Sequence, residues 1–208
     1  MYTDQIARII HIVFAFGIVL SVHEAAHAGM AYLLGDDTAK RMGRLTLNPL
    51  VHIDPIGLLC LLLFKIGWAK PVMFDHRNFK RPKLYSVLTA YAGPASNFVL
   101  ALLMMVFLKY LPVNYMSASM VVTFANLLKV TAWVSVMLGV FNLLPIPPLD
   151  GSHILTVMLM DRRPDLLILL HRYSFIILIV FLVLLRSMSN SLLLLMDTVY
   201  NFLGSLVF

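Results

Sequence analysis

Residues 6–34 read IARIIHIVFAFGIVLSVHEAAHAGMAYLL, an apolar stretch that carries two histidines and a glutamate near its end. The stretch is longer than the roughly 20 residues with which an α-helix crosses a hydrocarbon core of about 30 Å. If the helix begins near Ile6, His23 lies about 25 Å along it, still within the hydrocarbon. Ionisable side chains at that depth are unfavourable without a partner and usually mark a function. The stretch therefore predicts a membrane-spanning helix that carries a polar site.

The composition of the whole chain also indicates a membrane protein. Of its 208 residues, 61% are hydrophobic and 12% are charged, and the mean hydropathy is +0.89, which excludes an ordinary soluble domain. The net charge is +6, but the basic residues separate apolar blocks and do not form a surface with aromatic residues, so no nucleic-acid partner is predicted. The single cysteine, Cys60, excludes an intrachain disulfide and a cysteine-rich metal site.

Further apolar blocks predict the rest of the membrane domain. Four of them are close to spanning length, at residues 84–111, 120–144, 166–185 and 192–208. The block at residues 56–66 is about half that length, so we expect it to be re-entrant or packed within the protein. Residues 44–47 alternate polar and apolar side chains before Asn48-Pro49, which predicts a brief β-strand closed by a turn.

The predicted fold class is therefore an all-α polytopic membrane protein. It has about five to six transmembrane helices, with a short β-strand or re-entrant element between the first helix and the next span. The chain contains no internal repeat and no linker, so residues 1–208 are expected to form a single integral membrane domain. Its core is expected at about residues 6–160, with additional C-terminal helices at 165–208.

The basic residues predict the orientation of the chain in the bilayer. Most lie between the first two predicted spans or after the third: Lys40, Arg41, Arg44, Lys65, Lys70, Arg77, Lys80, Arg81, Lys83, Arg162 and Arg163. The opposite side has only Arg8, Lys109 and Arg186. The positive-inside rule places the basic loops in the cytoplasm and the N-terminus outside. Five crossings would then return the C-terminus to the cytoplasm.

His23-Glu24-Ala25-Ala26-His27 is an HExxH sequence within the first predicted helix. Four residues turn a helix by about 400°, so the two imidazoles lie on one face, about 6 Å apart along the axis. That arrangement suits two ligands of one zinc ion. Glu24 is the only glutamate in the chain and lies about 100° around the helix from His23. It can act as general base toward a water molecule that the metal activates.

A catalytic zinc ion usually has three protein ligands and one open position, so one more ligand is needed. A second glutamate does not exist, and leucines stand where an extended HExxH pattern would place a third histidine. The remaining candidates are Asp150, Asp54, His52, His153, Asp36 and Asp37. Asp150 is favoured because it follows a run with three prolines, residues 142–149, that imposes non-helical backbone at membrane depth. Such backbone is tolerated only where it is buried in protein or lines a wet cavity.

The other polar residues have less direct interpretations. Asn97 is expected to pack between helices, where it can bond across to a neighbour, whereas Asn142, just before the proline-rich run, is expected to face the cavity that Asp150 lines. His52 and Asp54 lie among turn residues and are expected to form a structural pair. His153 is expected to be a helix-terminal or supporting residue.

Three motifs together resemble the site-2 protease family of intramembrane zinc metalloproteases, in a compact form without a PDZ or other regulatory domain. They are the HEAAH helix, Gly93-Pro94-Ala95-Ser96-Asn97, and the run from Asn142 to Gly151. The resemblance covers roughly residues 10–160. It implies that His23, His27 and Asp150 bind zinc, one ion per chain. It also implies that Glu24 activates water and that Asn142 helps to hold the substrate carbonyl or its oxyanion.

The resemblance also implies a function. The protein would hydrolyse a peptide bond within, or near the cytoplasmic edge of, a transmembrane helix of a membrane protein substrate. It would lie in the lipid bilayer of a bacterial or archaeal cell, with its active site toward the cytoplasm. The alternative is a non-catalytic membrane protein that binds or transports zinc, but Glu24 argues against it because such a site needs ligands and has no use for a base. Substrate identity and oligomeric state do not follow from the sequence.

Overall fold

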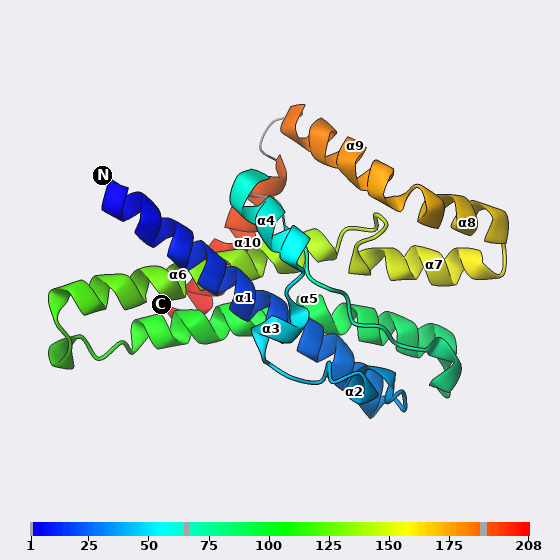
Figure 1. Ribbon diagram of the computed structural model, residues 1–208, viewed down its shortest axis with the longest axis horizontal. Coiled ribbons are helices and arrows are strands. Elements are labelled where there is room, and N and C mark those ends of the chain that lie inside the picture. The colour runs from blue at the N-terminus through cyan, green and yellow to red at the C-terminus, as the bar shows by residue number, and fades with distance from the viewer. Residues whose placement is uncertain (1, 65–66, 188–190) are drawn as a thin grey trace.

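The computed structural model describes residues 2–64, 67–187 and 191–208, which fold into α-helices joined by irregular segments (Figure 1). The three longest helices are α1 (Tyr2–Leu33), α5 (Pro82–Lys109) and α6 (Ala118–Asn142). Proline at the first position favours the start of α5, and the Ser117 side chain caps α6 by accepting a hydrogen bond from the Met120 N–H. These helices match three of the five expected spans.

Among the residues that the structure describes, three segments are long and apolar enough to cross a membrane: Ile9–Leu33, Pro82–Lys109 and Ala118–Asn142. The block at 166–185 is instead divided into α8 (Pro164–Arg172) and α9 (Ser174–Ser187), which meet at an angle of 67°. The polar pair His171-Arg172 lies at this break. The pair of helices counts as a fourth span only if the bent unit crosses as one. The last block is α10 (Ser191–Val207), with 17 residues. The expected five to six spans are therefore not confirmed.

The segment between α1 and α5 is largely irregular. It contains α2 (Thr38–Arg41), α3 (Pro49–His52), α4 (Pro55–Phe64) and the short 3-10 helix η1 (His76–Asn78). Of the short apolar block, residues 65–66 lie outside the described residues, as does the basic Lys65. With 10 residues, α4 is too short to cross the membrane as a straight helix, in agreement with the expectation.

The expected β-strand at residues 44–47 is absent from the structure. The Thr46 N–H donates to the carbonyl of Arg44, only two residues earlier, so the backbone turns too tightly there to be a strand. Within the described ranges the only β-pairing is an isolated antiparallel bridge between Ile53 and Ala69. Alternation over four residues was therefore too short a signal to distinguish a strand from a turn.

The core forms where α1, α5 and α6 pack together, with α10 against α5 and α6. Small side chains such as Ala15, Ala101 and Ala132 are fully or almost fully buried there. Helices in lipid associate through close packing, and small residues allow that approach. Many large apolar side chains, including Ile9, Phe14 and Phe107, instead point outward. An apolar exterior around a core of small residues is typical of helices that face lipid.

The C-terminus does not return to the side of the basic loops. Lys109, at the C-terminal end of α5, donates a hydrogen bond to the carbonyl of Val207 near the end of α10. Figure 1 shows both chain termini on the same half of the molecule, away from α2 and α7 (His153–Met160). The expectation of a fifth crossing that returns the C-terminus was therefore wrong. Along the long axis of Figure 1, α9 and α10 both run toward the half of the molecule that holds the two termini.

Candidate metal centre

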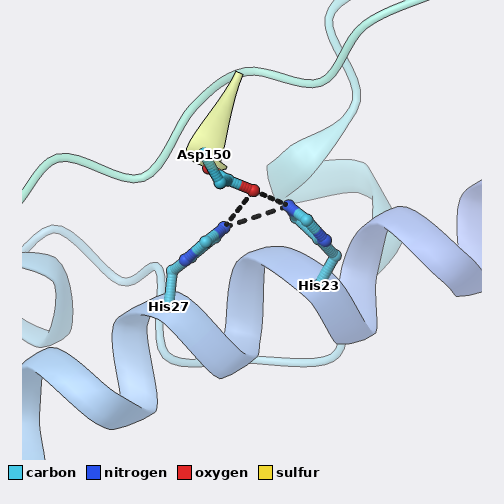
Figure 2. Close-up of side chains that lie close together, drawn as sticks. All are labelled: His23, His27 and Asp150. Atoms are coloured by element: carbon cyan, nitrogen blue, oxygen red, sulfur yellow. Dashed lines mark hydrogen bonds and ion pairs between the residues drawn. The ribbon is translucent and has the colours of Figure 1, made fainter. Parts of the chain in front are cut away.

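His23 and His27 lie one turn apart on α1, and their side chains point toward Asp150 (Figure 2). The two Nε2 atoms are 3.0 Å apart. Asp150 Oδ2 lies 3.1 Å from Nε2 of His23 and 3.4 Å from Nε2 of His27. The histidines are 4% and 7% exposed. Two imidazole nitrogens and a carboxylate oxygen that converge in this way form a group that could hold one metal ion.

Helix α5 contacts the Nδ1 atoms of both imidazoles. The His27 Nδ1 lies 2.8 Å from the backbone carbonyl of Thr89, which can only accept a hydrogen bond. The His23 Nδ1 lies 3.0 Å from the side-chain amide of Asn97. Contacts of this kind at Nδ1 fix the ring of a metal-binding histidine and direct Nε2 toward the metal. The sequence predicts that Asn97 packs and bonds between helices but does not identify His23 as its partner, and a backbone carbonyl such as that of Thr89 leaves no signal in a sequence.

Gly93 leaves the space that the two imidazoles occupy. A Cβ atom at this position would lie 2.3 Å from Nε2 of His27 and 2.7 Å from Cε1 of His23. Both distances are far below van der Waals contact, so a side chain on Gly93 would displace the rings. The two imidazoles therefore require glycine at this crossing of α1 and α5. This requirement is additional to the close helix packing that glycine generally allows.

Asp150 is brought to the histidines by irregular backbone after α6. It begins the 3-10 helix η3 (Asp150–Ser152). Gly151 lets this turn approach the end of α6, because a Cβ there would lie 2.3 Å from the carbonyl oxygen of Leu143. The Asp150 Oδ2 atom has no well-directed hydrogen bond and remains available as a ligand atom.

Glu24 is 8% exposed and is held by the loop that precedes η1. Its Oε2 accepts a hydrogen bond from the Val72 N–H at 3.0 Å. A carboxylate with one such bond retains free lone pairs that can accept a proton. The contact connects Glu24, the candidate base, to a loop 48 residues later in the chain. The HExxH motif alone does not reveal this contact.

Asn142 is not held toward the metal centre by a hydrogen bond. It ends α6, and its side-chain amide donates to the Leu138 carbonyl of the same helix at 3.0 Å. His153, the first residue of α7, stacks near Phe74 with ring centroids 5.8 Å apart. Burial lowers the pKa of His153. It does not belong to the group formed by the two histidines and Asp150.

The other candidate ligands have structural partners elsewhere. Asp54 Oδ1 accepts the N–H groups of Ile56 and Gly57 and so caps α4. His52 is fully buried, and its Nε2 lies 2.9 Å from the Thr46 carbonyl. These two residues are therefore structural, as expected, but each has its own partner and they do not form a pair.

Asp36 and Asp37 follow α1 and also have structural roles. The Asp37 carboxylate forms an ion pair with Arg41 at 2.6 Å. Asp36 is fully buried and accepts hydrogen bonds from Thr38, from the Asn78 side chain and from the Asp75 N–H. Asp36 therefore anchors the loop whose Val72 N–H contacts Glu24.

Replacing Asp36 with Ala should loosen this loop. Several donors would lose a buried anionic acceptor, at a cost of about 2 kcal/mol or more. Hydrogen exchange at residues 75–78 should rise strongly in the purified protein. The hydrogen bonds hold the Asp36 pKa below its ordinary value against the opposing effect of burial, so the stabilisation is present near neutral pH and is lost as the pH falls through the lowered pKa.

Asp37→Ala is the matched control for Asp36→Ala. Its ion pair with Arg41 is largely exposed and contributes about 1 kcal/mol or less. Equal hydrogen exchange at residues 75–78 in the two variants would show that Asp36 does not anchor the loop.

Together, the apolar helices and the buried group of two histidines and a carboxylate define an integral membrane protein with a metalloenzyme-type site. The family model described as Peptidase family M50 matches residues 111–185, which include Asn142 and Asp150. The chain belongs to this family, the site-2 protease family, and is an intramembrane zinc metalloprotease.

Similar proteins cover most of the chain. A Bacillus subtilis protein with the name "Putative zinc metalloprotease YwhC" is 43% identical over 149 residues, which make up 70% of this chain and 67% of that protein. The Mycolicibacterium smegmatis protein "Putative zinc metalloprotease Rip2" is 33% identical over 79% of this chain and 63% of its own length. Its Mycobacterium tuberculosis namesake is 32% identical over 64% of this chain and 51% of its own length. No solved structure matches.

Proposed function

We propose that His23, His27 and Asp150 hold one zinc ion per chain and that Glu24 is the general base. The observation that carries the proposal is the convergence of two Nε2 atoms and Asp150 Oδ2 in a buried group. The donor set suits zinc, because imidazole and carboxylate are common zinc ligands and three of them leave one position open for catalysis. The lack of a well-directed hydrogen bond at Asp150 Oδ2 agrees with a role as ligand.

The proposed reaction is hydrolysis of a peptide bond. When bound, zinc supplies a Lewis acid that makes water more acidic and polarises the substrate carbonyl. Glu24 would accept a proton from the attacking water as the C–O bond forms, and would return it to the leaving amine as the C–N bond then breaks. The Val72 N–H holds the Glu24 carboxylate during this transfer. Asn142 would turn its amide from the Leu138 carbonyl to the oxyanion that develops on the substrate.

The proposed substrate is a transmembrane helix of another membrane protein, cut within the membrane or near its cytoplasmic edge. The carbonyls of a helix are already hydrogen-bonded within it, so the substrate must unwind before water can attack. Ile53 and Ala69 form an antiparallel β-bridge, and Ala69 is close in sequence to Val72. We infer that an unwound substrate segment could pair with the backbone beside this bridge.

We further propose that the active site faces the cytoplasm of a bacterial or archaeal cell. Lys83, at the start of α5, forms an ion pair with Asp161, next to Arg162 and Arg163. The two groups of basic residues therefore lie at the same end of the helices, which supports their assignment to one side by the positive-inside rule. In this proposal the chain acts as a single membrane domain, residues 1–208 with a core at about 6–160, and α8 with α9 forms one bent crossing.

Zinc analysis tests the assignment of the ligands. The purified protein in detergent should contain one zinc ion per chain, and Asp150→Asn should remove most of it, because the amide is a far weaker ligand than the carboxylate. Asp161→Asn is the matched control and should keep the full zinc content, since Asp161 only pairs with Lys83 at the surface. Full zinc content in Asp150→Asn would exclude Asp150 as a ligand.

A further inference from the structure

Asn97 is a fully buried amide that contacts one of the proposed zinc ligands. It lies on α5, and its Nδ2 is 3.0 Å from Nδ1 of His23. Its Oδ1 is buried without a hydrogen-bond partner. The two ends of a side-chain amide are nearly equal in size and exchange when the amide turns by 180°. Either orientation therefore leaves the far end without a partner, so neither orientation is favoured except through the contact with His23.

The orientation of this amide is coupled to which nitrogen of His23 carries the proton. With Nδ2 toward the ring, Nδ1 must accept, so a neutral His23 carries its proton on Nε2 and cannot bind a metal through that atom. With Oδ1 toward the ring, Nδ1 donates and the lone pair of Nε2 is free. The Nε2 atom is the one that lies 3.1 Å from Asp150 Oδ2. Zinc binding at this atom therefore requires Oδ1 of Asn97 to face His23.

His27 needs no such choice. Its Nδ1 lies 2.8 Å from the Thr89 carbonyl, which can only accept, so a neutral His27 carries its proton on Nδ1 and has a free lone pair on Nε2. The two ligands on α1 thus differ. The tautomer of His27 is set by the backbone of α5, whereas the tautomer of His23 depends on one side chain.

Helix α6 keeps Asn97 in place. The Ser135 hydroxyl, itself fully buried, donates to the Asn97 backbone carbonyl at 2.8 Å. Gly139 allows the close approach, because a Cβ there would lie 3.4 Å from Cβ of Asn97 and 3.1 Å from the Phe98 ring. The Asn97 side chain therefore has little freedom except a 180° rotation of its amide. This rotation is the motion that lets Asn97 match either tautomer of His23.

We infer that Asn97 is a positioning residue that, through Oδ1, accepts the Nδ1–H of His23 and so stabilises the tautomer whose Nε2 can bind zinc. This inference rests on the proposed role of His23 as a ligand. Residues that hold a metal-binding histidine in this way typically change metal affinity by about 10–100-fold when they are replaced. Asn97 is thus assigned a specific role beyond the packing that the sequence indicated.

The test measures zinc affinity by competition with a chelator in the purified, detergent-solubilised protein. Asn97→Leu, similar in size but without an acceptor, should weaken zinc binding by about 10–100-fold. Asn97→Asp should remain within about tenfold of the parent, because a carboxylate also accepts the Nδ1–H and is a common partner of zinc-binding histidines. With cobalt in place of zinc, Asn97→Leu should also change the visible absorption spectrum, whereas Asn97→Asp should retain the band pattern of the parent.

Thr131→Val is the matched control. Thr131 is equally buried, on α6, but its hydroxyl bonds only to the Leu127 carbonyl of its own helix. The control should bind zinc as the parent does. If Asn97→Leu does not fold, Asn97→Ala makes the same comparison with less demand on packing.

The outcomes separate this inference from the function on which it rests. Parent-like zinc affinity and cobalt spectrum in folded Asn97→Leu or Asn97→Ala would overturn the role of Asn97 alone. Equal losses in Asn97→Leu and Asn97→Asp would also overturn it, because the acceptor would then not matter. A parent protein that binds no zinc, or a His23→Ala variant that binds it as well as the parent, would instead refute the proposed metal centre.

Discussion

Replacing Glu24 with Gln should lower the cleavage of a transmembrane substrate by about 10²–10⁴-fold while zinc stays bound. Glutamine has the same shape as glutamate, and its amide oxygen can still accept the hydrogen bond from the Val72 N–H. The amide of glutamine, however, is too weak a base to accept a proton from water. Since Glu24 is the only glutamate in the chain, no second residue of that type can replace it. The measurement compares zinc content and cleavage in proteoliposomes that contain a single-pass reporter.

Asp37→Asn is the control, because it makes the same change from acid to amide at an exposed ion pair with Arg41. It should retain both zinc and cleavage. Cleavage at the parent rate by Glu24→Gln would refute the assignment of the base, even if zinc is bound as proposed. Loss of zinc from Glu24→Gln would show that Glu24 supports the metal site and that its effect on rate cannot be read as loss of a base.

The proposed metal ligands could be selected from the sequence because two simple signals mark them. His23 and His27 are four residues apart, and helical geometry alone places them on one face. Asp150 could be favoured over the other acidic residues because three prolines precede it at membrane depth. The structure then brings these three side chains together.

The support for these ligands could not be predicted, because it depends on which helices meet. Neither the Thr89 carbonyl nor the Val72 N–H belongs to a side chain, so no residue type marks them. The contact of Asn97 with His23 joins positions 74 residues apart and requires the crossing of α1 and α5 at Gly93. Packing of this kind depends on long-range geometry that one sequence does not contain.

The number of spans was harder to predict for a related reason. Hydropathy depends on composition within a block, so it did not distinguish one straight helix from α8 and α9, which meet at 67°. Likewise, a block such as α10 is apolar without showing in which direction its helix runs. The direction became visible only through the contact between Lys109 and the Val207 carbonyl.

Replacing Gly93 with Ala should abolish zinc binding, and with it cleavage, although only one methyl group is added. The new Cβ would lie 2.3 Å from Nε2 of His27 and 2.7 Å from Cε1 of His23. The imidazoles would have to rotate away, because the Cβ is fixed to the backbone of α5 and cannot move aside on its own. Both rings are also held at Nδ1, by Thr89 and Asn97, so rotation breaks those contacts as well.

Gly204→Ala provides the matched control for Gly93→Ala. Gly204 is also a helical glycine, on α10, and a Cβ there would meet nothing within 4 Å. Alanine should stabilise that helix by about 1 kcal/mol and leave zinc content unchanged. The measurement is zinc per chain after purification, together with the thermal unfolding temperature in detergent. If the Gly93→Ala protein has the unfolding temperature of the parent but contains no zinc, the effect of the substitution is confined to the histidines. Full zinc content in that variant would mean that the imidazoles do not occupy the space beside Gly93 when the metal is bound.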